Sequence, residues 1–296
     1  MTRRGWVLFW SLGVIWGIPY LLIKVAVEHL SPSVLVCVRV AVAAALLLPL
    51  AAARGWLRPV RRKLGWVLVF AAVEIGVPFG LLSWAEQRIT SSLTGLLVAA
   101  VPLFAALLAW MLHLDARPGG LRLVGLLVGL AGVACLVGLD VHGGDLVAVA
   151  AVLVSAFCYA VGPMVVTLRL AQLPSIAVSG VAMAAAAIAY LPPAVRQWPA
   201  GGATSVPWTA WAAVVALGAV CSALAFILFF ALISEVGPAR TTVITYVNPA
   251  VALVLGVLVL GEPITVGLLV GFPLVVAGSW LATRTARTVA AEPQTR

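Results

Sequence analysis

Ten apolar stretches of about 20 residues constrain the fold of this chain more than any other feature. They occupy residues 6–27, 34–53, 65–84, 91–113, 121–139, 146–167, 176–195, 208–233, 241–260 and 264–283. A helix needs about 20 mostly apolar residues to cross the hydrocarbon core of a bilayer. The stretches do not alternate with a period of two, and they are too long for the strands of a membrane barrel. We therefore predict an all-α integral membrane protein with ten transmembrane helices.

The composition agrees with a membrane protein. Hydrophobic residues make up 64% of the 296 residues and charged residues only 9%, whereas a soluble domain carries about 25% charged residues. Arg3 and Arg4 precede the first apolar stretch, as in a secretory signal, but no small-residue cleavage site follows them. We expect this stretch to remain in the membrane as a helix.

The boundary between the last two stretches rests on three residues, Gly261, Glu262 and Pro263. Proline ends one helix and suits the first turn of the next, so we expect two helices here. The four cysteines, Cys37, Cys135, Cys158 and Cys221, lie inside apolar stretches without CxxC spacing. We expect them to be small buried hydrophobic residues, with neither a disulfide framework nor a metal site.

Lysine and arginine are distributed unevenly between the two sets of alternate loops. Fourteen of the eighteen fall on the side of the N-terminus, and only Arg88 and Arg196 fall on the other side. Because these residues accumulate in cytoplasmic loops, we expect both termini in the cytoplasm and the protein in a bacterial inner membrane. The net charge of +9 then belongs to the inner leaflet and does not indicate a nucleic-acid partner.

The two halves of the chain resemble each other. Five apolar stretches precede the polar segment VHGGD at 141–145 and five follow it, so the second half must enter the membrane from the opposite side. The following residues match in pairs: Thr94 with Thr241, Pro102 with Pro249, Asp115 with Glu262, Gly125 with Gly271, Gly132 with Gly278, and the segment SLGVIWGIP at Ser11 with SAFCYAVGP at Ser155. We predict two inverted repeats, 6–139 and 145–283, followed by a cytoplasmic tail, 284–296.

Inverted repeats with interrupted helices are typical of secondary transporters. Prolines stand at matching positions, Pro19 with Pro163 and Pro102 with Pro249. Kinks at these positions would serve a rocking motion between the halves. The alternative is ordinary packing, because membrane helices tolerate proline where neighbours satisfy the freed carbonyl group.

Four blocks of the sequence resemble the EamA-type members of the drug/metabolite transporter superfamily. They are WSLGVIWGIPYLLIK, WAEQRITSSLTGLL, PLFAALLAWMLHLD and NPAVALVLGVLVLGEP, and the likeness runs from residue 6 to residue 283. Arg39 and Lys24 match basic residues that are common in the family's second and first spans. Asp115 departs from the Gly-Glu that usually ends the first repeat, and we expect this difference to alter a helix cap. The resemblance implies a basket of ten helices and the export of a metabolite or amino acid, without fixing the substrate.

Three ionisable residues lie inside the first three stretches, where charge is costly and marks function. Glu74 lies near the middle of the third stretch, Arg39 inside the second, and Lys24 near the outer end of the first. One interpretation is an ion pair of Glu74 with Arg39, with Lys24 reaching the membrane surface. The other makes Glu74 a proton or cation site in an aqueous cavity. Both remain open, and the summed charge of +1 favours an anionic or zwitterionic substrate.

Further candidates line particular helix faces. Trp16, Tyr20 and Lys24 are spaced by four residues and share a face. The alternative is an aromatic belt at the membrane surface, which Trp16, nearer the middle, fits poorly. Thr245 and Asn248 line a face of the ninth stretch together with Thr241, and we expect Asn248 either to bind substrate or to bridge helices. Tyr159, beside Pro163, is a weaker candidate.

Other protein classes find little support. No GxSxG, HExxH or phosphate-binding glycine motif occurs, so we expect no enzyme, no metal and no cofactor. An intramembrane enzyme and a non-transporting receptor or scaffold are the rival classes. Glycine-spaced faces in the fifth and tenth stretches indicate close helix packing rather than dimerisation, which favours a monomer. We expect a carrier that exports a small metabolite, an amino acid or a related solute, by alternating access and with possible coupling to protons.

Overall fold

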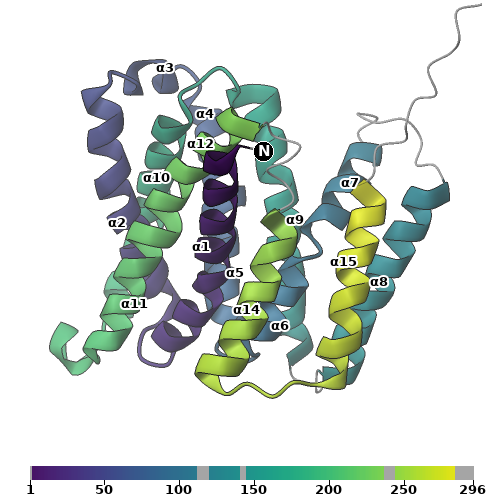
Figure 1. Ribbon diagram of the computed structural model, residues 1–296. Coiled ribbons are helices and arrows are strands. Elements are labelled where there is room, and N and C mark those ends of the chain that lie inside the picture. Colours follow the sequence, from purple (N-terminus) through teal and green to yellow (C-terminus); the bar gives the residue numbers. More distant parts are fainter. Residues whose placement is uncertain (1, 112–119, 141–144, 237–243, 284–296) are drawn as a thin grey trace, which may run out of the picture.

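The computed structural model describes residues 2–111, 120–140, 145–236 and 244–283 (Figure 1). Within these ranges, seven helical segments are long and apolar enough to cross a membrane, and three further apolar helices are shorter. All ten coincide with the predicted stretches, and the described ranges contain no strand. The prediction of an all-α membrane protein with ten spans is therefore confirmed.

The helices of each half follow the same order. The first half contains α1 (Arg3–Val27), α2 (Pro32–Ala53), the short α3 (Leu57–Arg61), a third span made of α4 (Leu64–Phe70), η1 (Ala71–Gly76) and α5 (Val77–Ala85), a fourth made of α6 (Ser91–Val98) and α7 (Val101–Met111), and α8 (Gly120–Asp140). The second half contains α9 (Leu146–Val165) with η3 (Val166–Leu170), α10 (Ser175–Arg196), η4 (Ala203–Ser205), an eighth span made of α11 (Trp208–Gly218), η5 (Ala219–Leu224) and α12 (Ala225–Val236), then α14 (Ile244–Leu260) and α15 (Val266–Thr283).

Local signals explain where several helices begin and end. Ser31 Oγ accepts a hydrogen bond from the Val34 N–H (3.4 Å), and Pro32 occupies the first turn of α2. The Thr90 hydroxyl caps α6 in the same way, accepting from the Leu93 N–H at 3.2 Å. α14 ends at Leu260 and is followed by Gly261, whose φ of +67° is a conformation that glycine adopts at little cost. The predicted division between the last two spans is therefore confirmed.

Equivalent spans of the two halves pack against each other and run antiparallel. On α2 and α10, on α6 and α14, and on α8 and α15, residue numbers rise along one helix as they fall along its partner. The facing pairs are Cys37 with Ala187 and Leu47 with Gly180, Ser92 with Gly256 and Gly95 with Ala252, and Gly125 with Gly278 and Gly132 with Gly271. Antiparallel contact between equivalent helices means that the halves are inverted, as the sequence predicts.

The fifth and tenth spans approach each other through their glycines (α8 and α15 in Figure 1). A Cβ atom on Gly132 would lie 2.6 Å from the Val275 nitrogen, and one on Gly278 would collide with the backbone of Gly129. Only glycine lets the two backbones come this close. The repeat-matched glycines therefore pack two helices of one chain together, as predicted.

Two large hydrophobic clusters make up most of the interior. One joins α2 and α10 to the third and eighth spans, and the other joins α5, α6 and α9 to α8 and α15. Tyr159 on α9 packs against both clusters and stays partly accessible. The junction of the two clusters is therefore the place where the side chains of a central site can meet.

Candidate functional site

The third and eighth spans contain π-helical segments at equivalent positions. Glu74 lies in η1, and Cys221, its counterpart in the repeat, lies in η5. A π-helical turn inserts one extra residue into an α-helix and disturbs its hydrogen-bond ladder, and such turns are frequent at functional sites. The sequence did not predict these segments. They lie at corresponding depths in the two halves and mark the centre of the bundle.

Each π segment is contacted by a polar side chain from the other half of the chain. The Tyr190 hydroxyl on α10 donates a hydrogen bond to the Gly76 carbonyl oxygen at 2.8 Å. In the other direction, Arg39 Nε on α2 donates to Ser222 Oγ at 3.2 Å, and Ser222 donates to the Leu217 carbonyl oxygen at 2.9 Å. Because α2 and α10 are equivalent helices, the two halves hold each other's π segments by matching routes.

Arg39 lies at the centre of the bundle as a buried cation, with 4% of its surface exposed. Its guanidinium carbon sits 3.7 Å from the centre of the Phe79 ring, and its Nε bonds to Ser222. In the described ranges the two terminal nitrogens have no hydrogen-bond partner. Arginine presents a planar pair of N–H groups that fits a carboxylate, so Arg39 is equipped to bind an anion here.

The interpretation of an ion pair between Glu74 and Arg39 is wrong for this conformation. The one ion pair among the described residues joins Arg4 to Glu235 at 4.0 Å. Arg39 contacts Ser222 and Phe79 instead. Glu74 Oε2 is buried against Gly162 on α9 and has no hydrogen-bond partner in the part of the chain that the structure describes. A side chain at Gly162 would occupy the space of this oxygen. The other interpretation, a proton or cation site at Glu74, remains a prediction.

The predicted face of Trp16, Tyr20 and Lys24 contacts three different elements. Trp16 packs against Phe229 on α12, with ring centres 5.0 Å apart, and Tyr20 is buried against Gly95 on α6. Lys24 Nζ donates to the carbonyl oxygens of Glu86 and Ile89, at 2.7 and 3.0 Å, and so joins α1 to the connection between α5 and α6. Tyr20 thus points toward the interior, whereas Lys24 is held by backbone near the helix ends.

Three of the predicted residues meet at the junction of the two clusters. Tyr20, Arg39 and Tyr159, from α1, α2 and α9, lie within electrostatic range of one another. Glu74 lies within range of Tyr159 and Cys158, but Arg39 is not among its interacting groups. The structure therefore assembles a cation and two phenol groups at the centre, with one carboxyl group beside them.

The ninth span contributes a helix bridge. In the amide orientation that satisfies its neighbours, Asn248 donates to the carbonyl oxygens of Gly13 on α1 and Ile244, both at 3.1 Å. This contact agrees with the bridging alternative for Asn248. Thr245 is partly buried on the same helix and makes an interaction of its own. Thr241 lies outside the described residues.

The four predicted kinks are not alike. Pro19, Pro163 and Pro249 lie inside continuous helices, although a π-helical segment, η3, follows α9 shortly after Pro163. Pro102 follows a break at Ala99–Ala100 that divides the fourth span into α6 and α7. The sequence symmetry between Pro102 and Pro249 is therefore not matched by an equal interruption of the two helices.

Sequence reasoning missed Glu86, which is fully buried directly after α5. An acidic residue at a helix C-terminus opposes the helix dipole, and that signal was present in the block WAEQR. The repeated acid Glu262 has a plain structural role, since its carboxylate accepts from the N–H groups of Ser91 and Ser92 at 2.7 and 2.9 Å and caps α6. Its partner Asp115 lies outside the described residues.

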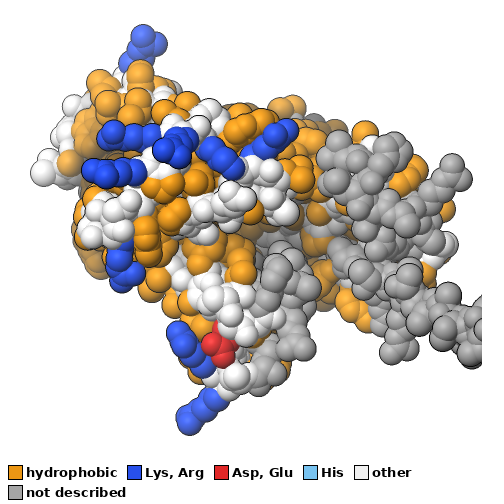
Figure 2. Space-filling view, turned by 90° about the horizontal axis from the view of Figure 1, so that it is seen from above, with side chains coloured by type: hydrophobic (Ala, Val, Ile, Leu, Met, Phe, Trp, Pro, Cys, Tyr) orange, Lys and Arg blue, Asp and Glu red, His pale blue; other side chains and the backbone are white. Residues whose placement is uncertain are grey.

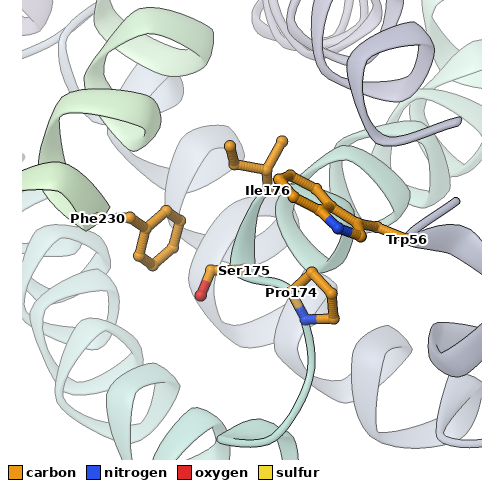
Figure 3. Close-up of a pocket in the computed structure, with 5 residues that line it drawn as sticks. All are labelled: Trp56, Pro174, Ser175, Ile176 and Phe230. Atoms are coloured by element: carbon orange, nitrogen blue, oxygen red, sulfur yellow. The ribbon is translucent and has the colours of Figure 1, made fainter. Parts of the chain in front are cut away.

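A pocket of about 310 Å³ opens beside α3, at one end of the bundle (Figure 3). Its lining is mostly apolar and consists of Trp56, Pro174, Ser175, Ile176 and Phe230. Phe230 and Trp56 lie on opposite sides of Ser175 in the close-up. Ring contacts from Phe230 to Phe226 (6.2 Å) and from Phe226 to Trp16 (6.4 Å) connect this pocket with α1.

Basic residues gather at the same end. Figure 2 looks down on the end at which α3 and the start of α1 lie, and its Lys and Arg side chains are spread over this face. They include Arg58, Arg61, Arg62 and Arg169, all of them exposed. The connection between α10 and α11, which contains Gly201, lies at the opposite end (Figure 1).

The inverted bundle with a central polar cluster defines a multi-pass membrane transporter, and the comparisons with known proteins agree. The chain belongs to the EamA-like transporter family, whose model matches twice, over residues 3–138 and 146–284. This family lies within the drug/metabolite transporter superfamily that the sequence blocks resemble. Membership points away from an enzyme, because the named relatives are transporters.

Two relatives are 29% identical to this chain. One, named an uncharacterized inner membrane transporter YedA of Escherichia coli, aligns over 86% of this chain and 82% of its own length. The other, named a probable terminal-alkyne amino-acid exporter of Streptantibioticus cattleyicolor, aligns over 96% of this chain and 94% of its own length. A crystal structure with a TM-score of 0.67 and 21% identity, covering 96% of this chain and 98% of its own, shares the fold.

Proposed function

We propose that the protein exports an amino acid or a related anionic or zwitterionic metabolite across a bacterial inner membrane by alternating access. Arg39 carries this proposal, because it is a buried cation whose terminal N–H groups have no partner in the described structure. An uncompensated cation at membrane depth is costly unless a ligand neutralises it. A substrate carboxylate would supply the missing partner, with the hydroxyls of Tyr20 and Tyr159 nearby. The name of the relative in Streptantibioticus cattleyicolor supports an amino-acid substrate.

The inverted halves support alternating access. The hydrogen bonds from Tyr190 to η1 and from Arg39 to η5 cross between the halves, so a substrate bound at Arg39 would alter how they are held together. We place the solute's entry at the pocket beside α3 and its exit at the opposite end. Proton coupling would use Glu74, whose Oε2 is buried without a hydrogen-bond partner among the described residues.

A transport assay tests the substrate class. Purified protein in proteoliposomes is expected to exchange at least one member of a panel of radiolabelled amino acids above the rate of empty liposomes. Arg39→Gln should reduce this exchange at least tenfold, about the effect of losing 1.4 kcal/mol of binding. Arg88→Gln is the matched control, because Arg88 is exposed and stacks on Trp84 outside the bundle centre. Exchange that survives in Arg39→Gln would remove Arg39 from the binding site, and no exchange by the wild type would refute an amino-acid substrate.

The orientation has its own test. We propose that the face rich in Lys and Arg, both termini and the tail 284–296 are cytoplasmic, and that the chain works as a monomer with repeats at 6–139 and 145–283. Single cysteines are introduced at Arg61 and Gly201 after removal of Cys37, Cys135, Cys158 and Cys221. An impermeant maleimide should label position 201 in intact cells and position 61 only after permeabilisation. Labelling of both from the same side would refute the inverted topology.

A further inference from the structure

A second buried carboxyl group lies at the end of the third span that faces away from α3. Glu86 follows α5 directly and has none of its surface exposed. Neither of its carboxyl oxygens has a hydrogen-bond partner among the described residues. Glu74 differs, because it keeps partial exposure and only its Oε2 is buried without a partner. Glu86 is therefore the more completely enclosed of the two groups.

Charged and titratable groups surround Glu86 from several elements. Lys24 and Tyr20 face it from α1, Arg39 from α2, and Glu262 from the connection between α14 and α15. Lys24 is the cation with the stronger electrostatic effect on Glu86. Its ammonium group, however, donates hydrogen bonds to the backbone carbonyl oxygens of Glu86 and Ile89 rather than to the carboxyl group. The hydroxyls of Ser83 on α5 and Ser91 at the start of α6 are also buried without a partner among the described residues. Titratable groups thus lie around Glu86, but none of the described residues donates a hydrogen bond to its carboxyl oxygens.

An ionised carboxylate without a hydrogen bond is strongly disfavoured in such a place. Burial raises the pKa of Glu86 well above its ordinary value, the negative charge of Glu262 acts in the same direction, and Lys24 and Arg39 oppose the shift. Burial without a hydrogen-bond donor therefore favours the protonated, neutral form of the carboxyl group. Water that reaches it would let it ionise, with Lys24 already positioned at its backbone.

We propose that Glu86 is the outer proton-binding site of the transport cycle, taking a proton from the external water and holding it while the site is closed. The proton arrives from hydronium when this end opens. When the carboxyl group ionises, the proton leaves either to water or toward the proposed inner site at Glu74. Tyr20 lies within electrostatic range of Glu86, Tyr159 of Tyr20, and Glu74 of Tyr159, so titratable side chains connect Glu86 to the proposed inner site. This inference rests on the proposed function for its role in transport, whereas proton binding at Glu86 stands by itself.

The direct test uses the proton as the ligand. A group with a raised pKa contributes stability that is complete at low pH and is lost as the pH rises through its folded pKa. The melting temperature of the detergent-solubilised protein should therefore fall as the pH rises from about 5 to about 9, and it should fall more steeply in the wild type than in Glu86→Gln. Infrared difference spectra should also lose a protonated-carboxyl band in Glu86→Gln. Glu28→Gln, which alters an exposed carboxylate at the same end, is the control and should match the wild type.

The outcomes separate this inference from the proposed function. Equal pH profiles and equal spectra in the wild type and Glu86→Gln would overturn proton binding at Glu86, as would stabilisation by sodium at constant pH that disappears in Glu86→Gln. If Glu86→Gln does not fold, the protonated-carboxyl band is sought in Glu74→Gln, which retains Glu86 but lacks the other buried carboxyl group, and absence of the band there would overturn the inference. In proteoliposomes, Glu86→Gln should lose the uptake of protons driven by an amino-acid gradient, whereas the control Glu28→Gln should retain it. A wild type that binds the proton but exchanges no amino acid would refute the proposed function and leave the proton site in place.

Discussion

The third span, Leu64–Ala85, and the eighth, Trp208–Val236, contain π-helical segments at equivalent positions but carry different side chains there. η1 contains Glu74, whereas η5 contains Cys221 and Ser222. The polar contact to η1 is a neutral tyrosine hydroxyl, and the contact to η5 is the cation of Arg39. The repeat thus preserved a backbone irregularity in both halves, while the charges in and around it became specific to one half. We infer that the π segments serve the motion and the charges serve the ligands.

The largest expected effect concerns Glu74, the carboxyl group in η1. Glu74→Gln keeps the shape and hydrogen-bonding capacity of the side chain but cannot carry a proton, so transport driven by a pH gradient should fall at least tenfold. Stability should hold, because Glu74 has no ion-pair partner among the described residues that the change would leave unpaired. Proteoliposome flux and thermal denaturation measure the two quantities. Cys221→Ser, at the equivalent position of η5, is the control and should transport normally.

A collapse of stability in Glu74→Gln would instead show that Glu74 neutralises a buried cation in another state of the cycle. The double variant Glu74→Gln, Arg39→Gln should then recover much of the lost stability, because neither charge remains unpaired. Unchanged stability with unchanged gradient dependence would make Glu74 a bystander. The two π segments would then be functionally alike, and the comparison would fail.

The next effect concerns the packing beside each π segment. A Cβ atom on Gly218 would lie 2.5 Å from the Arg39 carbonyl oxygen and 2.7 Å from Val42 Cβ, so Gly218→Ala forces α2 away from the eighth span. Overpacking of this kind costs about 1–3 kcal/mol. Gly65→Ala is the matched control in the third span, because nothing lies within 4 Å of a Cβ there. Denaturation in mild detergent should show a lower melting temperature for Gly218→Ala alone, and equal values would contradict a tight contact at η5.

The hydrogen bonds to the two segments should differ in strength. Ser222→Ala leaves the buried Arg39 Nε without an acceptor, and bonds to charged groups contribute about 1.5–3 kcal/mol. Tyr190→Phe leaves only the Gly76 carbonyl oxygen unpaired, for which about 1 kcal/mol is expected. Paired stability measurements on the two variants check this order. The reverse order would mean that Arg39 has another acceptor and that η1 is the more firmly held segment.

The sequence predicted the spans because each depends only on the local length of an apolar run. It also predicted the inversion, since an odd number of spans in each half and matched prolines and glycines suffice for that inference. It did not predict the π segments, because AAVEIG and AVCSAL contain no proline and no polar pattern that distinguishes a π-helical turn from an α-helical one. Pro78 follows η1 closely, but the next proline after η5 is Pro238, beyond the end of α12.

The candidate site was only partly accessible to sequence reasoning. Residue type and depth in the membrane identified Arg39, Tyr20 and Glu74. Their contacts come from other helices, as with Ser222 for Arg39 and Gly162 for Glu74, so no local pattern could assign them. Lys24 and Glu86 show the same limit, because backbone carbonyl acceptors and complete burial depend on how α1 packs against the end of the third span.

The smallest expected effect concerns the prolines of the fourth and ninth spans, where the halves also differ. α6 and α7 are separated at Ala99–Ala100, and the N–H groups of Leu103 and Phe104 both bond to the Ala100 carbonyl oxygen. Pro102→Ala restores a donor beside this break, which should allow a continuous helix. Pro249→Ala adds a donor to a helix that is already continuous. We therefore expect Pro102→Ala to slow amino-acid exchange several-fold and Pro249→Ala to slow it less, with normal membrane insertion in both.

This last comparison separates the motion from the packing. If the break at Ala99–Ala100 acts as a hinge, a continuous helix there should slow the exchange of bound substrate. Equilibrium binding should not weaken, because the proposed binding residue Arg39 lies on another helix, α2. Stopped-flow exchange beside ligand-induced thermal shift would distinguish the two quantities. Equal slowing by both substitutions would indicate that α14 bends at Pro249 in another state of the cycle. Wild-type rates in both variants would leave the π segments η1 and η5, rather than the prolines, as the elements that the inverted halves use to move.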